Sequence, residues 1–219
     1  MKYMDEYIIS QMYGTQSDKS SPSTDQQTGE KLSSAEMEDF IQEQTIIVNE
    51  QPIHFTKVEL LDQGIECFLP DHFATMPPAE ARLKYPSEQR PTVIYCNPDG
   101  TVDFTLDPSE MEAEEGELEQ IAKQLSVMIR DVQPIRSWKG METLVTGHMT
   151  MTIIRFVTSA IDGHIYNEMM LFNHKGKMHI GTFHCEAEKL EQWKPVTEII
   201  IRSLRPLTEK EHIYESGLS

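Results

Sequence analysis

The sequence has no long apolar segment and no sign of paired cysteines. No stretch approaches the roughly 20 apolar residues that cross a bilayer, and the first 13 residues contain Asp5 and Glu6 where a secretory signal needs a continuous apolar run. The cysteines are widely spaced and form no CxxC pair: Cys67, Cys96 and Cys185. We therefore expect a cytoplasmic protein with reduced thiols that does not insert into a membrane.

Basic residues are also few. The chain has 19 Lys and Arg against 36 Asp and Glu, a formal net charge of -17. Such a negative field repels nucleic-acid phosphates and anionic lipid surfaces, so neither is an expected partner. Hydrophobic residues make up 38% of the 219 residues, enough for the core of one domain with an extension.

The common catalytic signatures are absent as well. The chain contains no GxSxG, GxGxxG, GxxxxGK[ST] or HExxH, the patterns of hydrolases, nucleotide-binding proteins and metalloproteases. Nothing in the sequence marks a base or an oxyanion donor for Cys185 as a nucleophile. We predict that the protein is not an enzyme and needs no cofactor.

The chain divides into an arm, a domain and a tail. Residues 14–29 are rich in Ser, Thr, Gln and Asp and lack aliphatic side chains, which is typical of a disordered linker. Residues 1–44 are therefore predicted to be a flexible N-terminal arm with short helical segments, one of them opened by a capping box from Ser33 to Glu36. Residues 45–206 form the predicted domain, and 207–219 a C-terminal tail.

Hydrophobic periodicity predicts helices and strands within that domain. Helices are expected over 77–86, over 118–132 and over 193–204, the second with a stripe of Leu, Ile, Met and Val at helical spacing. Strands are expected at 45–48, 53–61, 64–70, 92–106 as a hairpin, and 135–185. The carboxylate run from Glu110 to Glu119 is compatible with a metal or acid/base cluster, but we interpret it as a solvated helix start. The fold class is α+β, with a mostly antiparallel sheet flanked by helices.

Three segments carry a family resemblance. These are GIECFLPDHFATMPPAEARLKYPSEQRPTVIYCNPDGTVDFTL, then IYNEMMLFNHKGKMHIGTFHC, and Trp193 followed by IIIRSL. Their order and spacing over about residues 64–204 resemble the PsbP-like family. That family includes the photosystem protein PsbP, a yeast Ran-binding (Mog-type) protein, bacterial DcrB-type proteins and the Eag-type chaperones of type VI secretion effectors. The resemblance implies an α/β/α sandwich and a non-enzymatic role in binding another protein.

Four histidines are crowded near one predicted hairpin: His164, His174, His179 and His184. A metal site there is one interpretation. However, His184 and Cys185 are adjacent on a strand and must point to opposite faces, so we interpret the four as ordinary sheet and turn residues and predict no metal.

The turns at Asp162-Gly163 and Lys175-Gly176 set a strand register. If both are two-residue turns, Phe156 lies opposite Met169, Ile154 opposite Leu171, and Leu171 opposite Ile180. One face of this three-stranded meander is then a core face. The other, which we call the mixed face, combines apolar side chains with an Arg–Glu pair expected on diagonal neighbours; it also carries Val157 and His179. Its candidate partner-binding residues are Met151, Ile153, Arg155, Tyr166, Glu168, Met170, Phe172 and Phe183.

The mixed face leaves two interpretations open. Exposed aromatic and Met side chains mark an interaction site, whereas a second helix layer over the face makes it core. The sequence-based hypothesis is a cytoplasmic chaperone or adaptor that binds an apolar, helical segment of a protein partner, such as secretion cargo, and that is able to form a homodimer. The alternatives are a hydrolase or ligand-binding protein using Arg155, Glu168 and His179, or a regulatory component acting through the arm.

Overall fold

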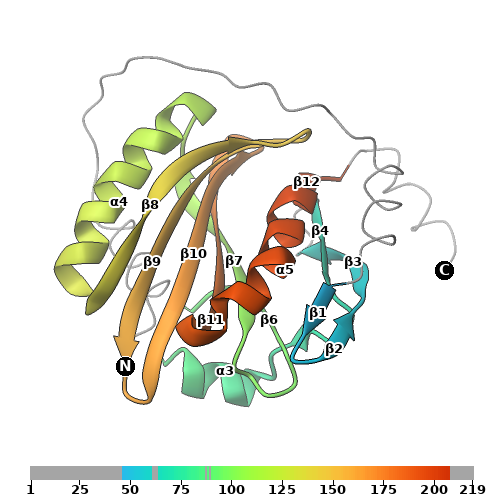
Figure 1. Ribbon diagram of the computed structural model, residues 1–219. Coiled ribbons are helices and arrows are strands. Elements are labelled where there is room, and N and C mark those ends of the chain that lie inside the picture. The colour runs from blue at the N-terminus through green and yellow to red at the C-terminus, as the bar shows by residue number, and fades with distance from the viewer. Residues whose placement is uncertain (1–45, 61–63, 87, 89, 208–219) are drawn as a thin grey trace, which may run out of the picture.

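The computed structural model describes residues 46–60, 64–86, 88 and 90–207. Its centre is a seven-stranded antiparallel sheet with the order β5-β6-β7-β11-β10-β9-β8 (Figure 1). The strands are β5 (Ala74–Thr75), β6 (Val93–Cys96), β7 (Asp103–Glu112), β8 (Ile135–Val145), β9 (Thr150–Ala160), β10 (Gly163–His174) and β11 (Lys177–Glu186). The α+β class with a mostly antiparallel sheet is confirmed. The predicted arm and nearly all of the predicted tail lie outside the described residues.

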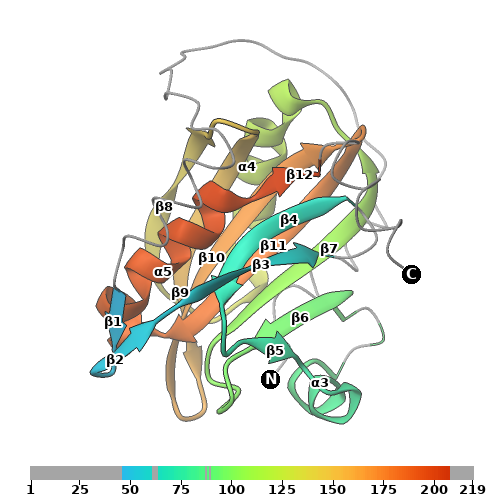
Figure 2. The same cartoon turned by 90° about the vertical axis from the view of Figure 1, so that its right-hand side faces the viewer.

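Two smaller sheets lie on one side of the large sheet (Figure 2). One has the order β12-β4-β3 and the other pairs β1 with β2. Their strands are β1 (Ile46–Val48), β2 (Gln51–Ile53), β3 (Phe55–Leu60), β4 (Ile65–Pro70) and β12 (Arg205–Pro206). The turn between the strands expected at 45–48 and 53–61 is shorter than those bounds imply. Asn49 and Glu50 alone make it, both at positive φ, and Pro52 already pairs with Ile47.

Helix α4 (Leu118–Val132) covers one face of the large sheet, as its apolar stripe predicts (Figure 1). Its buried residues are Leu118, Ala122, Leu125 and Ile129, which belong to one core with Ile154, Phe156, Met169, Leu171, Met178 and Ile180. A 3-10 helix, η2 (Glu115–Glu117), leads into α4 and begins in a capping box, in which the backbone N–H of Glu114 donates to Glu117 Oε2 at 3.0 Å. This part of the carboxylate run is a helix start, as expected.

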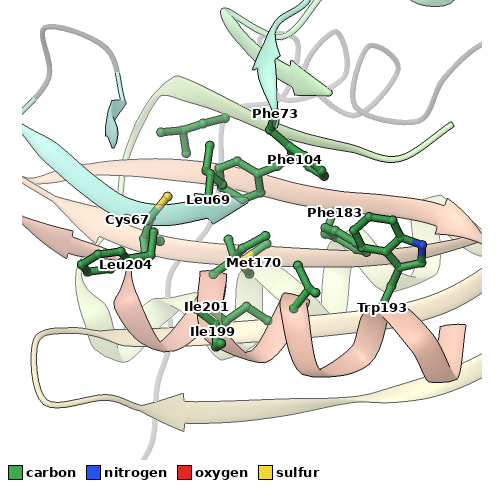
Figure 3. Packing of buried hydrophobic residues seen from close by; sticks show 14 of the residues in the cluster. Cys67, Leu69, Phe73, Phe104, Met170, Phe183, Trp193, Ile199, Ile201 and Leu204 are labelled. Carbon is green, nitrogen blue, oxygen red and sulfur yellow. The ribbon is translucent and has the colours of Figure 1, made fainter. Parts of the chain in front are cut away.

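Helix α5 (Leu190–Ser203) covers the opposite face (Figure 3). Trp193, Val196 and Ile200 are buried as the predicted stripe requires, but Ile199 and Ile201 are buried too. They are buried because the helix lies between the large sheet and the small sheets. The backbone N–H of Phe68 on β4 donates to Ser203 Oγ at 2.9 Å, which ties the end of the helix to the outer layer.

The strand register is confirmed at one turn and wrong at the other. Leu171 lies opposite Ile180 across a turn at Lys175-Gly176, as predicted. At the other turn, however, Ala160 pairs with Gly163, so the loop is Ile161-Asp162 and Met169 lies opposite Ile154 rather than Phe156. This slip of two residues leaves every side chain on its predicted face, because side chains alternate with a period of two.

Helix α3 (Pro78–Lys84) is confirmed at the predicted place, with Pro78 in its first turn. It packs over the β6–β7 end of the large sheet through a small separate core that includes Ala81, Tyr85 and Ile94. The strand alternation predicted for β7 is also correct, since Phe104 and Leu106 enter the α5 core. Its polar face is not solvated, however: Asp103 is fully buried under α3.

Candidate protein-interaction edge

The mixed face lies in the protein core. Its apolar members Met151, Ile153, Met170, Phe172 and Phe183 have no exposed surface, because α5, β1 and β4 cover them. The predicted open binding surface on this face is therefore wrong for the described structure. Of the two interpretations that the sequence left open, the covering layer is the one found.

The Arg–Glu pair of the mixed face belongs to a larger network of ion pairs and hydrogen bonds. Arg155 lies directly opposite Glu168, not diagonally as predicted, and its Nε donates to Glu168 Oε1 at 2.5 Å. Its Nη1 also lies 2.7 Å from a Glu142 carboxylate oxygen, and the Tyr166 hydroxyl donates to Glu168 Oε2 at 3.0 Å. Burial lowers the pKa of Arg155, but Glu168 and Glu142 outweigh this effect and raise it. These charges hold strands β8, β9 and β10 together.

The four histidines that are crowded in the sequence occupy three separate places in the structure. His164 lies 3.1 Å from Glu188, His174 and His179 meet edge to face at 5.6 Å, and His184 contacts Asp103. His179 lies opposite Phe172 and stacks on it, whereas Glu168 lies opposite Phe183. The constellation of Arg155, Glu168 and His179 is therefore not brought together. Within the part of the chain that the structure describes, no three His, Cys, Asp or Glu side chains are grouped to hold a metal ion.

The sequence did not predict a buried polar network centred on Asp103. Its Oδ1 lies 2.7 Å from His184 Nδ1 and accepts from the Tyr85 hydroxyl at 2.9 Å, and its Oδ2 contacts Lys84 Nζ. Burial raises the pKa of Asp103, but His184 and Lys84 outweigh it and lower the pKa to about 2. Lys84 also donates to the Gly100 carbonyl at 2.7 Å. Both carboxylate oxygens are thus engaged by the protein itself, and the network joins the end of α3 to β7 and β11.

The outer edge of β8 is the long unpaired edge of the large sheet. Among the described residues, β8 pairs with β9 alone, and it contains 11 residues, whereas β5 at the opposite edge contains two. Every second N–H and C=O on such an edge points away from the sheet, where another strand can bind them. β8 is therefore the surface best suited to bind an extended chain.

Two bulges divide β8 into an irregular and a regular half. Register shifts fall between Ile135 and Ser137 and between Trp138 and Gly140, so Arg136 and Lys139 are the extra residues, and both are exposed. Bulges and basic side chains are common protections of an edge against self-association. From Met141 to Val145 the pairing with β9 is regular, which leaves this half open to a further strand.

An aromatic platform lies beside the edge. Trp138 stacks on Phe156, with ring centroids 5.6 Å apart and an angle of 13° between the rings. The guanidinium of Arg130 at the end of α4 lies 4.0 Å from the centre of the Trp138 ring. The partly buried side chains of Met128 and Met141 border the same core. A chain bound along β8 would therefore meet apolar and cationic groups beside the free backbone.

Comparisons with known proteins support the fold but identify no family member. No protein-family model matches the chain, and no curated protein matches it. In the described residues no helix is long and apolar enough to cross a membrane.

Several solved structures are similar. Cyanobacterial PsbP (CyanoP) from Synechocystis gives a TM-score of 0.53 at 9% identity, covering 69% of this chain and 92% of that one. A Pseudomonas aeruginosa protein of unknown function gives 0.42 at 12%, covering 71% and 99%. LpqN, involved in cell envelope biogenesis of Mycobacterium tuberculosis, gives 0.42 at 11%, covering 82% and 100%. At such identities the likeness to CyanoP is one of fold alone, and the chain has the PsbP-like fold, a mostly antiparallel sheet flanked by helices.

Proposed function

We propose that this protein is a non-enzymatic protein-binding module, an adaptor or chaperone, that pairs an extended segment of its partner with the outer edge of β8. The observation that supports this proposal is the 11-residue edge strand with its regular stretch from Met141 to Val145. Strand addition needs a free row of backbone donors and acceptors, with side-chain sites beside it for specificity. The Trp138 platform and Met141 provide such sites.

The proposed partner segment is extended rather than helical. A helical segment needs an open apolar face, and the mixed face is already occupied by α5. Conversely, a helix has no free backbone groups to offer an edge strand, because its own turns use them. The family resemblance supports a chaperone or adaptor role, and secretion cargo is the partner class that it implies. A cytoplasmic location is part of the proposal and is supported by the three unpaired, buried thiols.

The test uses two neighbouring proline substitutions, Glu142→Pro and Thr143→Pro, with Glu142→Ala as the reference for the first because it loses the same ion pair with Arg155. Both residues lie in the regular half of β8 and are exposed, and consecutive backbone N–H groups in a strand point to opposite sides. One substitution therefore removes an N–H bonded to β9, and the other removes one that points outward. Partner capture from an extract of the native cells is compared between the wild type and the two variants, together with thermal melts.

We expect the two variants to separate stability from binding. The variant that loses the inward N–H should melt at a lower temperature, since proline removes a ladder hydrogen bond. The variant that loses the outward N–H should have a melting temperature close to that of the wild type. It should nevertheless fail to retain the partners that the wild type captures. If the stable variant retains the same partners, β8 is not the binding edge and the proposal is wrong. Light scattering of the wild type shows whether a second copy of the chain occupies the edge instead.

A further inference from the structure

The exposed cations beside β8 point to the chemistry of its partner. Arg130, Arg136 and Lys139 are all exposed, and none is within ion-pair distance of a carboxylate among the described residues. Many other cations in the structure do have such partners: Lys57, Lys84, Lys123, Arg155, Lys177, Lys189, Arg202 and Arg205. Other exposed cations, such as Arg82 and Lys194, also lack a carboxylate within ion-pair distance among the described residues, but Arg130, Arg136 and Lys139 are grouped beside one strand.

The placement of these cations favours carboxylate recognition. Arg136 and Lys139 are the two bulge residues, so they lie on the edge that an added strand would meet. Arg130 Cζ lies 4.0 Å from the centre of the Trp138 ring, and a guanidinium beside an aromatic ring is able to bind a carboxylate with two hydrogen bonds. Of the nearby acidic residues, Glu142 is already bound by Arg155, and Asp131 follows Arg130 on α4.

We infer that the segment bound at β8 is acidic, an extended stretch of Asp and Glu alternating with apolar residues. This inference rests on the proposed strand addition at β8 and specifies what is added. The apolar residues pack against Trp138 and Met141, and the carboxylates pair with Arg130, Arg136 and Lys139. A second copy of this chain fits less well, since its own β8 contains Arg136 and Lys139 and only one carboxylate, Glu142.

A random peptide library displayed on phage tests this inference with the full-length chain as bait. Selection is performed on the wild type and repeated on the double variant Arg136→Glu, Lys139→Glu. The matched control is Arg82→Glu, an exposed arginine on α3 at the other end of the sheet that has no ion pair among the described residues. Hydrogen exchange of the bait shows whether each selected peptide binds at β8.

We expect peptides that protect β8 to be enriched in Asp and Glu. Their affinity should fall on the order of tenfold or more in the double variant, because two ion pairs are lost and two repulsions replace them, and should be unchanged in Arg82→Glu. Peptides that protect β8 but carry no acidic excess, or that bind the double variant equally well, overturn the inference and leave the proposed function standing. If no selected peptide protects β8, both are wrong.

Discussion

At the scale of single residues, Asp103 is the side chain whose environment differs most from the one that the sequence predicts. Its alternation with Val102 and Phe104 correctly places it on the polar face of β7, and a polar face is ordinarily solvated. The structure buries it because the end of α3, 18 to 19 residues earlier in the chain, brings Lys84 and Tyr85 onto that face. No local pattern predicts such a contact, since it depends on how the helix packs.

The Asp103 network should make stability depend on acid pH. The folded-state pKa of Asp103, about 2, lies below its ordinary value of 3.8. The carboxylate therefore contributes stability that is present above about pH 4 and is lost as the pH falls toward 2, on the order of 2 kcal/mol. Asp103→Asn should remove this part of the pH dependence. It should also cost on the order of 3–5 kcal/mol at pH 7, because Lys84 and His184 lose their shared acceptor.

Urea unfolding at several pH values checks this prediction, with the exposed Asp99→Asn as the control. The difference in unfolding free energy between the wild type and Asp103→Asn should shrink as the pH falls from 4 to 2, whereas Asp99→Asn should follow the wild type. A difference that stays constant over this range would show that Asp103 does not titrate as the structure requires.

At the scale of elements, the position of α5 determines whether the mixed face is exposed or buried. Alternation along β9, β10 and β11 assigns the side chains to two faces correctly, but it does not say what covers either face. The information lies in α5 itself: Ile199, Ile200 and Ile201 are consecutive, and one stripe of a helix cannot hold all three. Three buried isoleucines in a row mean that the helix is contacted on more than one side, as the structure shows.

The burial of Phe172 gives a direct test of this covering layer. Phe172→Asp should unfold the domain or lower its unfolding free energy by more than about 3 kcal/mol, because a charge and a cavity replace a fully buried ring. Val127→Asp on the exposed side of α4, where the valine is 60% exposed, should change stability by less than about 1 kcal/mol. Thermal and urea melts of both variants suffice. A folded, near-native Phe172→Asp protein would mean that α5 does not cover this face.

β8 shows what element-scale prediction misses in a strand. Strand structure from residue 135 onward is predicted from the sequence, but neither the turn between β8 and β9 nor the bulges of β8 are. Gly140 has φ of +120°, a conformation that other residues adopt only with strain, and it follows the bulge residue Lys139. A single glycine within a strand signals such a bulge. The glycine does not, however, indicate that β8 is the last strand of the sheet. That depends on how the strands are ordered across the whole domain.

At the scale of the whole molecule, the fold is predictable and the binding surface is not. Periodicity and turn residues predict α3, α4, α5 and the antiparallel meander, because each is determined within a short stretch of chain. The interaction surface depends on which elements meet across the domain. The ion pair between Arg205 Nε and Glu66 Oε1, 2.5 Å apart and buried between β12 and β4, is one of the contacts that assemble the covering layer from opposite ends of the domain.

The most direct measurement of the central claim is amide hydrogen exchange along β8, with and without a bound partner segment. In the free protein, alternate amides from Met141 to Val145 should bond to β9 and exchange slowly, whereas those between them should point outward and exchange fast. Strand addition predicts that binding slows the outward set selectively, since each outward N–H gains an acceptor on the added strand. If binding leaves the outward amides of β8 fast and slows exchange on another surface, the account of this protein as a strand-adding module is contradicted.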